Sequence, residues 1–130
     1  MTFYDSSFLI EYLDGDEDAV AYVEAHLDER AITTPLVLFE VFQGEMFKSG
    51  PADFEAVDRA LGWLSVVDES AELARGAGDL QNELQQRGVT LAGRDAFIAG
   101  AAMRLDERLA VNDSNFDVEG MAEILDVDFA

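Results

Sequence analysis

The sequence predicts a single α/β domain, residues 1–130, with a mainly parallel central sheet of four or five strands flanked by helices. Short apolar segments typical of buried strands alternate along the chain with helical patterns of ten or more residues. This alternation is typical of a parallel sheet whose strands are joined by crossover helices. The length of 130 residues is common for one domain, and no internal repeat or linker divides it.

The first half of the chain is predicted to form two strands and three helices. Ser6 or Ser7 is placed to cap the first helix, and Pro35 is tolerated in the first turn of the third. The second helix follows an acidic stretch, which suits the positive end of its dipole. The expected elements are a strand over 1–5, a helix starting with SSFLIEYL, a helix within 14–30 with Val20, Val23 and Leu27 on one face, a strand over 31–34 and a helix over 35–48.

The second half, after the break SGP at 49–51, is expected to contain three helices and three strands. The longest helix is amphipathic and ends at Gly88, a residue type that favours helix C-termini. In the helix that opens with RDAFIAGAA, the residues three and four positions after Asp95 lie on the same helix face and are apolar. The Asp95 side chain is therefore expected to point inward or toward a cleft. The expected elements are helices over about 52–62, 70–87 and 93–106, the last burying Phe97, Ile98, Ala101, Ala102 and Leu105, and strands over 64–68, 109–113 and 122–127.

The charge balance is strongly acidic, with 28 Asp and Glu against 8 Lys and Arg and a formal net charge of −20. Basic partners, metal binding through many carboxylates, or adaptation to a high-salt cytoplasm would each account for it. The acids are spread along the whole chain and Lys48 is the single lysine, a pattern that favours salt adaptation. At molar salt the screening length falls to ~3 Å, so the net charge does not exclude a nucleic-acid substrate.

Composition also excludes several classes of protein. A hydrophobic content of 49% is that of a globular chain and not of a disordered acidic tail. There are no cysteines, hence no disulfides or thiolate metal sites. No apolar run approaches the ~20 residues of a membrane span, and the N-terminus lacks the pattern of a signal peptide. We therefore expect a cytoplasmic protein without a membrane partner.

Four carboxylates occupy unusual positions in this pattern. Asp5 and Asp113 each end a predicted strand, so both are expected at the edge of the sheet where parallel strands end. Glu40 lies within the apolar stretch LVLFEVF, where an isolated charge would cost several kcal/mol. Taken singly, Asp5 could cap a helix, Asp95 could be an acid of a first helical turn, and Asp113 could be a turn residue.

Together these acids require a positive partner, because carboxylates brought close to one another repel strongly. No basic cluster is available, since the nearest candidate, Arg94, is a single charge. A hard divalent cation such as Mg²⁺, which prefers oxygen ligands and is often held by only a few carboxylates, is the simplest answer.

Several short motifs follow one another in a recognisable order: YDSSFLI, FE on an early helix, RDAFIAGAA, and VNDSNF shortly before EILDV. With this order and spacing the sequence resembles, from end to end, a PIN-domain ribonuclease, and among these the VapC-type toxins of toxin–antitoxin pairs. The resemblance implies a three-layer PIN-like fold with an acidic site for Mg²⁺ or Mn²⁺ formed by Asp5, Glu40, Asp95 and Asp113, with Ser7 helping to position it.

The resemblance also implies partners: an RNA substrate, a second copy of the chain in a homodimer, and an antitoxin whose C-terminal segment lies in the groove leading to the acids. Four large side chains of one helix, Phe39, Phe42, Met46 and Phe47, are more apolar than one buried stripe requires. They predict either a helix buried on all sides or a face for one of these partners. The chain departs from the family at Val111, where Thr or Ser is common, and in its overall acidity.

The histidine content selects between two routes of RNA hydrolysis. A paired acid–base mechanism often uses two histidines, whereas this chain has only His26, in an acidic helix that predicts a solvated side chain. The metal-dependent route requires only oxygen ligands. On this hypothesis Glu40 is a ligand or orients the attacking water, and Arg94 either meets a phosphate or is a surface residue.

Two other functions fit the same residues. The chain could be a catalytically weak or inactive PIN-like interaction module in RNA processing, for which Val111 is the best support. It could also be another magnesium-dependent acidic α/β enzyme such as a phosphatase, although the D-x-D motif of one common type is absent after Asp5.

Overall fold

The computed structural model describes residues 2–48, 50–68, 70–105, 107–111, 116, 121 and 125–129. Within these residues, helices and strands alternate as the sequence predicts. In chain order they are β1 (Thr2–Tyr4), α1 (Ser6–Leu13), α2 (Glu17–Ala25), β2 (Ala31–Thr33), α3 (Pro35–Met46), α4 (Phe54–Ala60), β3 (Ser65–Val66), α5 (Ala71–Gln86), α6 (Gly93–Arg104), β4 (Arg108–Val111) and β5 (Val127–Phe129).

The strands form one five-stranded sheet in the order β3-β2-β1-β4-β5, and every neighbouring pair is parallel. β1 is the central strand, with Phe3 paired to Ile32 of β2 on one side and to Leu109 of β4 on the other. The chain builds the sheet outward from β1 to β3, then crosses back to β4. The strand order therefore reverses between β1 and β4, the position at which open α/β sheets bind ligands beyond their carboxyl ends.

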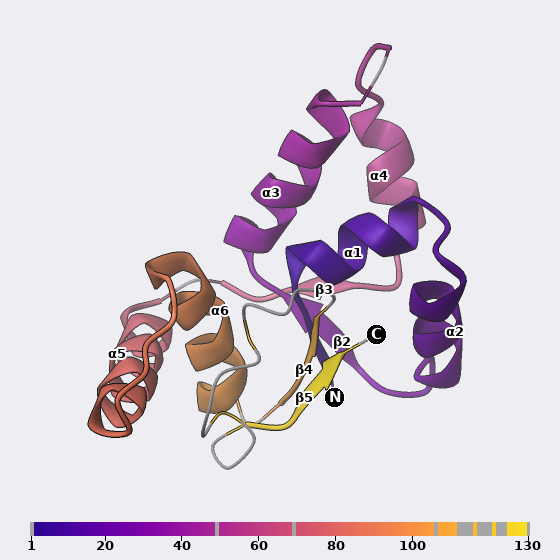
Figure 1. The fold of residues 1–130 in the computed structure, drawn as a ribbon. Coiled ribbons are helices and arrows are strands. Elements are labelled where there is room, and N and C mark those ends of the chain that lie inside the picture. The colour runs from indigo at the N-terminus through magenta and orange to yellow at the C-terminus, as the bar shows by residue number, and fades with distance from the viewer. Residues whose placement is uncertain are drawn as a thin grey trace.

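The helices cover both faces of the sheet. In Figure 1, α5 and α6 lie on one side of the strands, and α1 and α2 lie on the other. α1 packs against α2 and α3, and α6 packs against β4. α3 and α4 extend together beyond α1 at one end of the molecule (Figure 1). The three-layer α/β architecture predicted from the sequence is confirmed.

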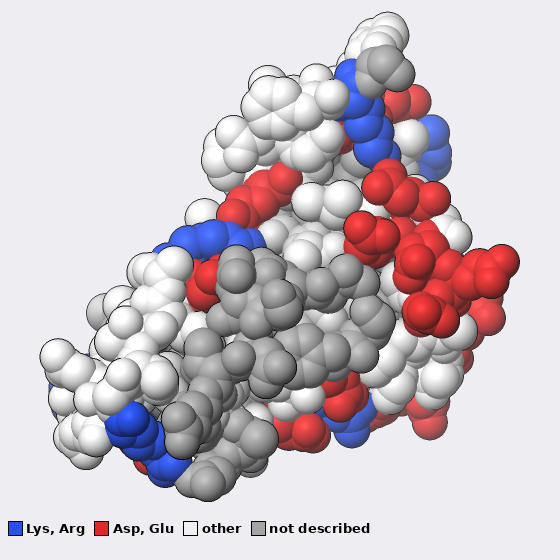
Figure 2. Space-filling model, viewed as in Figure 1, with Lys and Arg blue, Asp and Glu red and all other residues white. Residues whose placement is uncertain are grey.

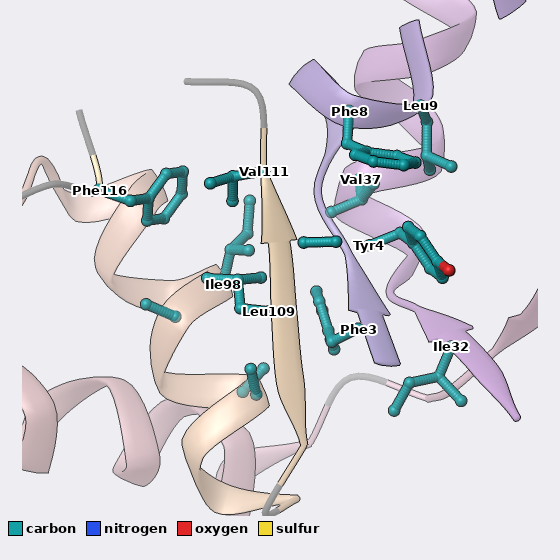
Figure 3. Close-up of a cluster of buried hydrophobic side chains, with 14 of the residues drawn as sticks. Phe3, Tyr4, Phe8, Leu9, Ile32, Val37, Ile98, Leu109, Val111 and Phe116 are labelled. Carbon is teal, nitrogen blue, oxygen red and sulfur yellow. The ribbon is translucent and has the colours of Figure 1, made fainter. Parts of the chain in front are cut away.

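The core fills both faces of the central strands, as expected for a parallel sheet enclosed by helices. Figure 3 shows Ile98 of α6 beside β4 on one face, and Phe8 of α1 with Val37 of α3 near β1 on the other. All three side chains are fully buried, as are Leu109 and Val111 of β4. Burying each such side chain stabilises the fold by about 1.5–3 kcal/mol, so β1 and β4 are held rigidly in place.

α6 is held against α5 by an unusually close contact between helices. A Cβ atom added at Gly100 would lie 2.3 Å from the Cα atom of Ala77, and one added at Gly76 would lie 2.8 Å from the carbonyl oxygen of Gly100. Only hydrogen atoms fit between the two backbones at these positions, which explains why both residues are glycine. This contact sets the position of α6 and hence of the residues at its N-terminus.

Three predicted elements differ in extent from those observed. The second helix ends at Ala25, so Leu27 lies in the turn that follows and is 64% exposed instead of sharing a buried face with Val23. The strand predicted over 64–68 contains only Ser65 and Val66, both exposed at the edge of the sheet. The last strand, predicted over 122–127, begins at Val127, while 122–124 lie outside the described residues.

These differences have a common physical reason, because residues near the ends of elements are placed by tertiary contacts as well as by local periodicity. None of the helices in the described part of the chain is both long and apolar enough to span a bilayer.

Candidate functional site

Asp5 lies directly after β1, at the point where the strand order reverses. Its backbone N–H donates to the carbonyl oxygen of Ala110 in β4 at 3.1 Å, which ties this end of β1 to the neighbouring strand. Asp5 is the N-cap residue of α1, but its side chain makes no capping hydrogen bond. The carboxylate is fully buried and points instead toward other side chains, so helix capping does not account for it.

Glu40 reaches the same place from α3. This helix begins after β2, where the Thr34 side chain accepts the N–H of Val37 and Pro35 occupies the first turn. Its buried face is formed by Val37 and Val41, and Glu40 lies beside this face with a side chain that is 23% exposed. Of the two apolar residues next to Glu40 in the sequence, Val41 is buried and Phe39 is exposed to solvent.

Arg94 and Asp95 belong to the first turn of α6. The Asp95 side chain is only 8% exposed, which confirms that it points inward. An acid in a first helical turn is also favoured by the helix dipole, so this simpler role applies to Asp95 at the same time. The preceding residue, Arg94, has a longer side chain that is 32% exposed and extends toward α3 and the end of β1.

The three carboxylates converge on the guanidinium of Arg94. Its Nη2 donates to Asp5 Oδ1 at 3.0 Å and to Glu40 Oε1 at 2.6 Å. Its Nε donates to Glu40 Oε2, which makes the Arg94–Glu40 pair bidentate, and its Nη1 donates to Asp95 Oδ1. Figure 2 shows basic and acidic atoms adjoining on the surface between α3 and α6. Residues from β1, α3 and α6 thus form one charged cluster, here called the acidic site.

Two serines complete the acidic site. The Ser7 hydroxyl donates to Asp5 Oδ2 at 3.1 Å, consistent with the positioning role expected for this residue. Ser6, expected from the sequence only as a possible helix cap, accepts a hydrogen bond from Arg94 Nη2. The sequence contained no signal for this contact, because Ser6 and Arg94 meet only through the fold.

The electrostatics of the acidic site are those of charges removed from water. Burial raises the pKa of the Asp5 carboxyl above its ordinary value; Arg94 and the hydrogen bond from Ser7 oppose this change, while the charge of Glu40 adds to it. Burial also disfavours the charge on Arg94, but hydrogen bonding to Glu40 and the charge of Asp5 outweigh it and raise the Arg94 pKa. Arg94 is therefore ionised, and its charge is what makes the cluster of acids tolerable.

The structure gives the acids a positive partner that the sequence did not predict. The sequence predicts that Arg94, as a single charge, either meets a phosphate or lies at the surface. The structure places the Arg94 guanidinium among Asp5, Glu40 and Asp95. The fourth predicted acid, Asp113, lies outside the described residues. Val111, where the family often has a hydroxyl, is fully buried and lies beside Phe116 in the core (Figure 3).

The donor set fits a hard divalent ion in its chemistry. Carboxylate oxygens are the ligands that Mg²⁺ and Mn²⁺ prefer, and those of Asp5, Glu40 and Asp95 already face one cation. In their present arrangement, however, no three acidic or histidine side chains of the described residues are grouped closely enough to hold an ion. The chemistry fits, whereas the spacing is that of carboxylates arranged around a guanidinium.

His26 lies at a different part of the molecule. It follows α2, before the start of β2, and hence lies toward the opposite end of the sheet from Asp5. Its ring stacks on Tyr22 with centroids 4.1 Å apart, and its side chain is only 22% exposed. The prediction of a solvated histidine is therefore wrong in detail, because the ring packs against a neighbouring helical side chain.

The fold and the acidic site define an α/β domain with carboxylates gathered at the carboxyl end of a parallel sheet. The chain belongs to the PIN domain family, whose sequence profile matches residues 2–118. No curated protein matches it significantly in sequence.

Solved structures share the fold over nearly the whole chain. VapBC2 from Rickettsia felis matches with a TM-score of 0.80 and 20% identity, covering 98% of this chain and 97% of that one. FitAcB from Neisseria gonorrhoeae matches with a TM-score of 0.80 and 18% identity, covering 100% and 97%. VapBC-5 from Mycobacterium tuberculosis, a member of the VapBC family of toxin–antitoxin systems, matches with a TM-score of 0.70 and 20% identity, covering 99% and 98%.

Proposed function

We propose that this chain is a metal-dependent endoribonuclease and the toxin of a type II toxin–antitoxin system. One observation carries the proposal: Asp5, Glu40 and Asp95, from three separate elements, converge at the strand-order reversal of the sheet. Membership of the PIN domain family and the fold shared with VapBC and FitAB proteins support it. The substrate is RNA, and we assign Mg²⁺ or Mn²⁺ as the cofactor.

The ligands proposed for the ion are Asp5, Glu40, Asp95 and Asp113. When held by these residues, a divalent ion would supply activation of a water and neutralisation of the charge that develops on the phosphate. Asp5 is held in one orientation by Ser7 and by the backbone contact to β4, so it is a fixed ligand. Glu40 is more exposed than Asp5 or Asp95, which suits it to orient the attacking water or to accept its proton.

The alternative acid–base route finds no support in the positions of the side chains. The chain contains 1 histidine, His26, and this residue stacks on Tyr22 toward the other end of the sheet. No second histidine exists to serve as its partner, so a mechanism that begins with paired histidines is excluded by composition.

The apolar surface of α3 and α4 supports the proposed protein partners. Phe39, Met46 and Phe47 are 60%, 58% and 78% exposed, which excludes the helix buried on all sides. Phe39 and Met46, with Phe42, Gln43 and Phe54, border a hollow of about 420 Å³. Much of the α3 surface in Figure 2 is uncharged. Such contiguous apolar exposure marks a protein interface. We propose that the antitoxin or a second copy of the chain covers it.

The acidic composition is part of the same proposal. We infer that the protein functions in a salt-adapted cytoplasm, where screening removes the repulsion between a chain of net charge −20 and an RNA backbone. RNA binding should then strengthen with added salt, opposite to the usual dependence of nucleic-acid binding.

The proposed activity is tested by incubating the purified chain with RNA in Mg²⁺ or Mn²⁺, at low and at molar salt, with and without a chelator. We expect metal-dependent cleavage that is lost in Asp5→Asn and Asp95→Asn. Asp28→Asn, an exposed aspartate of the turn after α2, is the matched control and should cleave at the normal rate. Normal cleavage by Asp5→Asn would show that the proposed site is wrong.

A non-catalytic interaction module remains the second candidate, and it is favoured by the presence of Arg94 where the ion would bind. Titration of Mn²⁺ into the metal-free protein separates the two functions. Binding that disappears in Asp95→Asn supports the enzyme, whereas no binding at millimolar Mn²⁺ supports the module.

A further inference from the structure

All three nitrogen atoms of the Arg94 guanidinium donate hydrogen bonds within the acidic site. Its Nε, Nη1 and Nη2 all donate to carboxylates, and Nη2 also reaches the Ser6 hydroxyl. A bidentate guanidinium–carboxylate pair such as Arg94–Glu40 is among the stronger ion pairs in proteins. One guanidinium therefore neutralises part of the charge of three carboxylates.

A divalent ion and this guanidinium compete for the same atoms. Arg94 Nη2 lies 3.0 Å from Asp5 Oδ1 and 2.6 Å from Glu40 Oε1. An ion such as Mg²⁺ requires oxygens at about 2.0–2.1 Å, and it would be repelled by a second cation in contact with those oxygens. The carboxylates cannot satisfy both at once.

Arg94 is the most exposed of the four charged residues in the acidic site. It lies in the first turn of α6, and its side chain is 32% exposed, whereas those of Asp5 and Asp95 are 0% and 8% exposed. The guanidinium thus covers the buried carboxylates from the solvent side. This exposed position gives the long side chain a path toward solvent by rotation about its own bonds.

We propose that Arg94 is the built-in counter-ion of the metal-free site, and that a divalent ion binds only when it displaces this side chain. The inference rests on the proposed function, because it takes Asp5, Glu40 and Asp95 to be metal ligands. Two consequences follow from linkage: Arg94 stabilises the metal-free protein, and it weakens the apparent affinity for metal.

The first test measures Mn²⁺ binding by isothermal titration calorimetry and thermal unfolding in chelator by circular dichroism. We expect Arg94→Gln to bind Mn²⁺ about tenfold more tightly than the wild type, within the usual range of coupling between two ligands, and to melt at a lower temperature in chelator. Arg94→Lys keeps the charge but not the planar fork, so both of its values should lie between those of the wild type and Arg94→Gln.

Arg104→Gln is the matched control, because Arg104 lies in the last turn of the same helix and pairs at 3.0 Å with Glu72, away from the acidic site. It should bind Mn²⁺ with wild-type affinity. If Arg94→Gln also binds with unchanged or weaker affinity, the displacement proposal is overturned while the metal site stands. If neither the wild type nor any variant binds Mn²⁺, the proposed metal-dependent function fails together with the displacement proposal.

A second measurement uses the wild-type chain and does not depend on the folding of a variant. In the metal-free protein the Arg94 Nε–H donates to Glu40, so its proton should exchange slowly with water in nuclear magnetic resonance spectra. Saturation with diamagnetic Mg²⁺ should release this group and make its exchange fast. An Arg94 signal that remains protected at saturating Mg²⁺ would overturn the proposal.

Discussion

Arg94 and Glu40 form a bidentate ion pair between residues 54 positions apart in the sequence. The pair joins the first turn of α6 to the middle of α3, and so links helices that pack on different parts of the sheet. It also gives the acids of this site a cation supplied by the protein itself. The stability of the metal-free protein therefore depends on how each acid is balanced.

Replacing Asp5 with Asn should raise the stability of the metal-free protein by about 1 kcal/mol, a typical size for a single substitution. Burial raises the pKa of this carboxyl, so its charged form destabilises the folded state at neutral pH, while Glu40 and Asp95 still hold Arg94. Thermal unfolding in chelator measures the change.

The same variant should lose the stabilisation that Mn²⁺ confers on the wild type, because a proposed ligand is gone. Asp28→Asn provides the control in both buffers and should behave like the wild type. A lower melting temperature for Asp5→Asn in chelator would mean that the pair with Arg94 outweighs the cost of burying the charge.

Substituting Gly100 with Ala should destabilise the protein by about 1–3 kcal/mol, since the new methyl group would lie 2.3 Å from the Cα atom of Ala77 and force α5 and α6 apart. Gly78 in α5 has no atom within 4 Å of such a methyl group, so Gly78→Ala is the matched control. It should stabilise the helix by about 0.5–1 kcal/mol. Equilibrium unfolding in urea measures the change in unfolding free energy for each variant. Equal changes in Gly100→Ala and Gly78→Ala would contradict the close contact between α5 and α6.

Stability should fall in alkali because of Tyr4. Burial, and then the charge of Glu29, raise the pKa of Tyr4 from 10.0 to about 12, with Arg108 opposing them. The folded state then holds this proton more tightly than the unfolded state. Stability is unaffected below about pH 10 and declines by roughly 2 kcal/mol as the pH approaches about 12.

Urea unfolding at a series of pH values measures this decline. Tyr4→Phe should remove the part due to Tyr4 and leave a decline of at least similar size due to Tyr22, whose pKa is also raised by burial and by the hydrogen bond to Asp128. An unchanged pH dependence in Tyr4→Phe would contradict the assignment.

Added salt should stabilise the protein. Its 28 acidic residues greatly outnumber its 8 basic residues, so the acidic side chains repel one another in the folded state. Raising the ionic strength from about 0.1 M to about 1 M shortens the screening length from ~10 Å to ~3 Å. We expect the melting temperature to rise by several degrees, because each kcal/mol of added unfolding free energy raises it by roughly 4 °C. Potassium and sodium chloride should act alike if screening is the cause, and a flat or falling melting temperature would argue against salt adaptation.

Removing one exposed aromatic ring from the α3 surface should weaken self-association without affecting the fold. Phe39 is 60% exposed, so Phe39→Gln should change the unfolding free energy by no more than about 0.5 kcal/mol. Analytical ultracentrifugation should then show a shift from dimer toward monomer. Leu27→Gln is the control, since Leu27 is 64% exposed in the turn after α2 and outside this surface. A dimer unaffected by Phe39→Gln would assign the surface to the antitoxin.

Local pattern was sufficient for much of this fold. The alternation of strands and helices is confirmed, and so is the convergence of Asp5, Glu40 and Asp95, because a strand end and an inward helix face can both be read from neighbouring residues. Their roles as metal ligands remain predictions. The close packing of Gly76 against Gly100 was not foreseen, since nothing near either residue reveals what lies across from it.

Hydrophobic periodicity and charge pattern act over a few neighbouring residues, so the α/β architecture and the unusual positions of Asp5, Glu40 and Asp95 could be read from the amino-acid sequence. That Arg94 is the cation of these acids, and that Phe39 of α3 is exposed to solvent, became visible only in the folded arrangement of the helices. Both outcomes depend on how helices distant in the chain pack together, and a long arginine side chain can reach several partners until that packing selects among them.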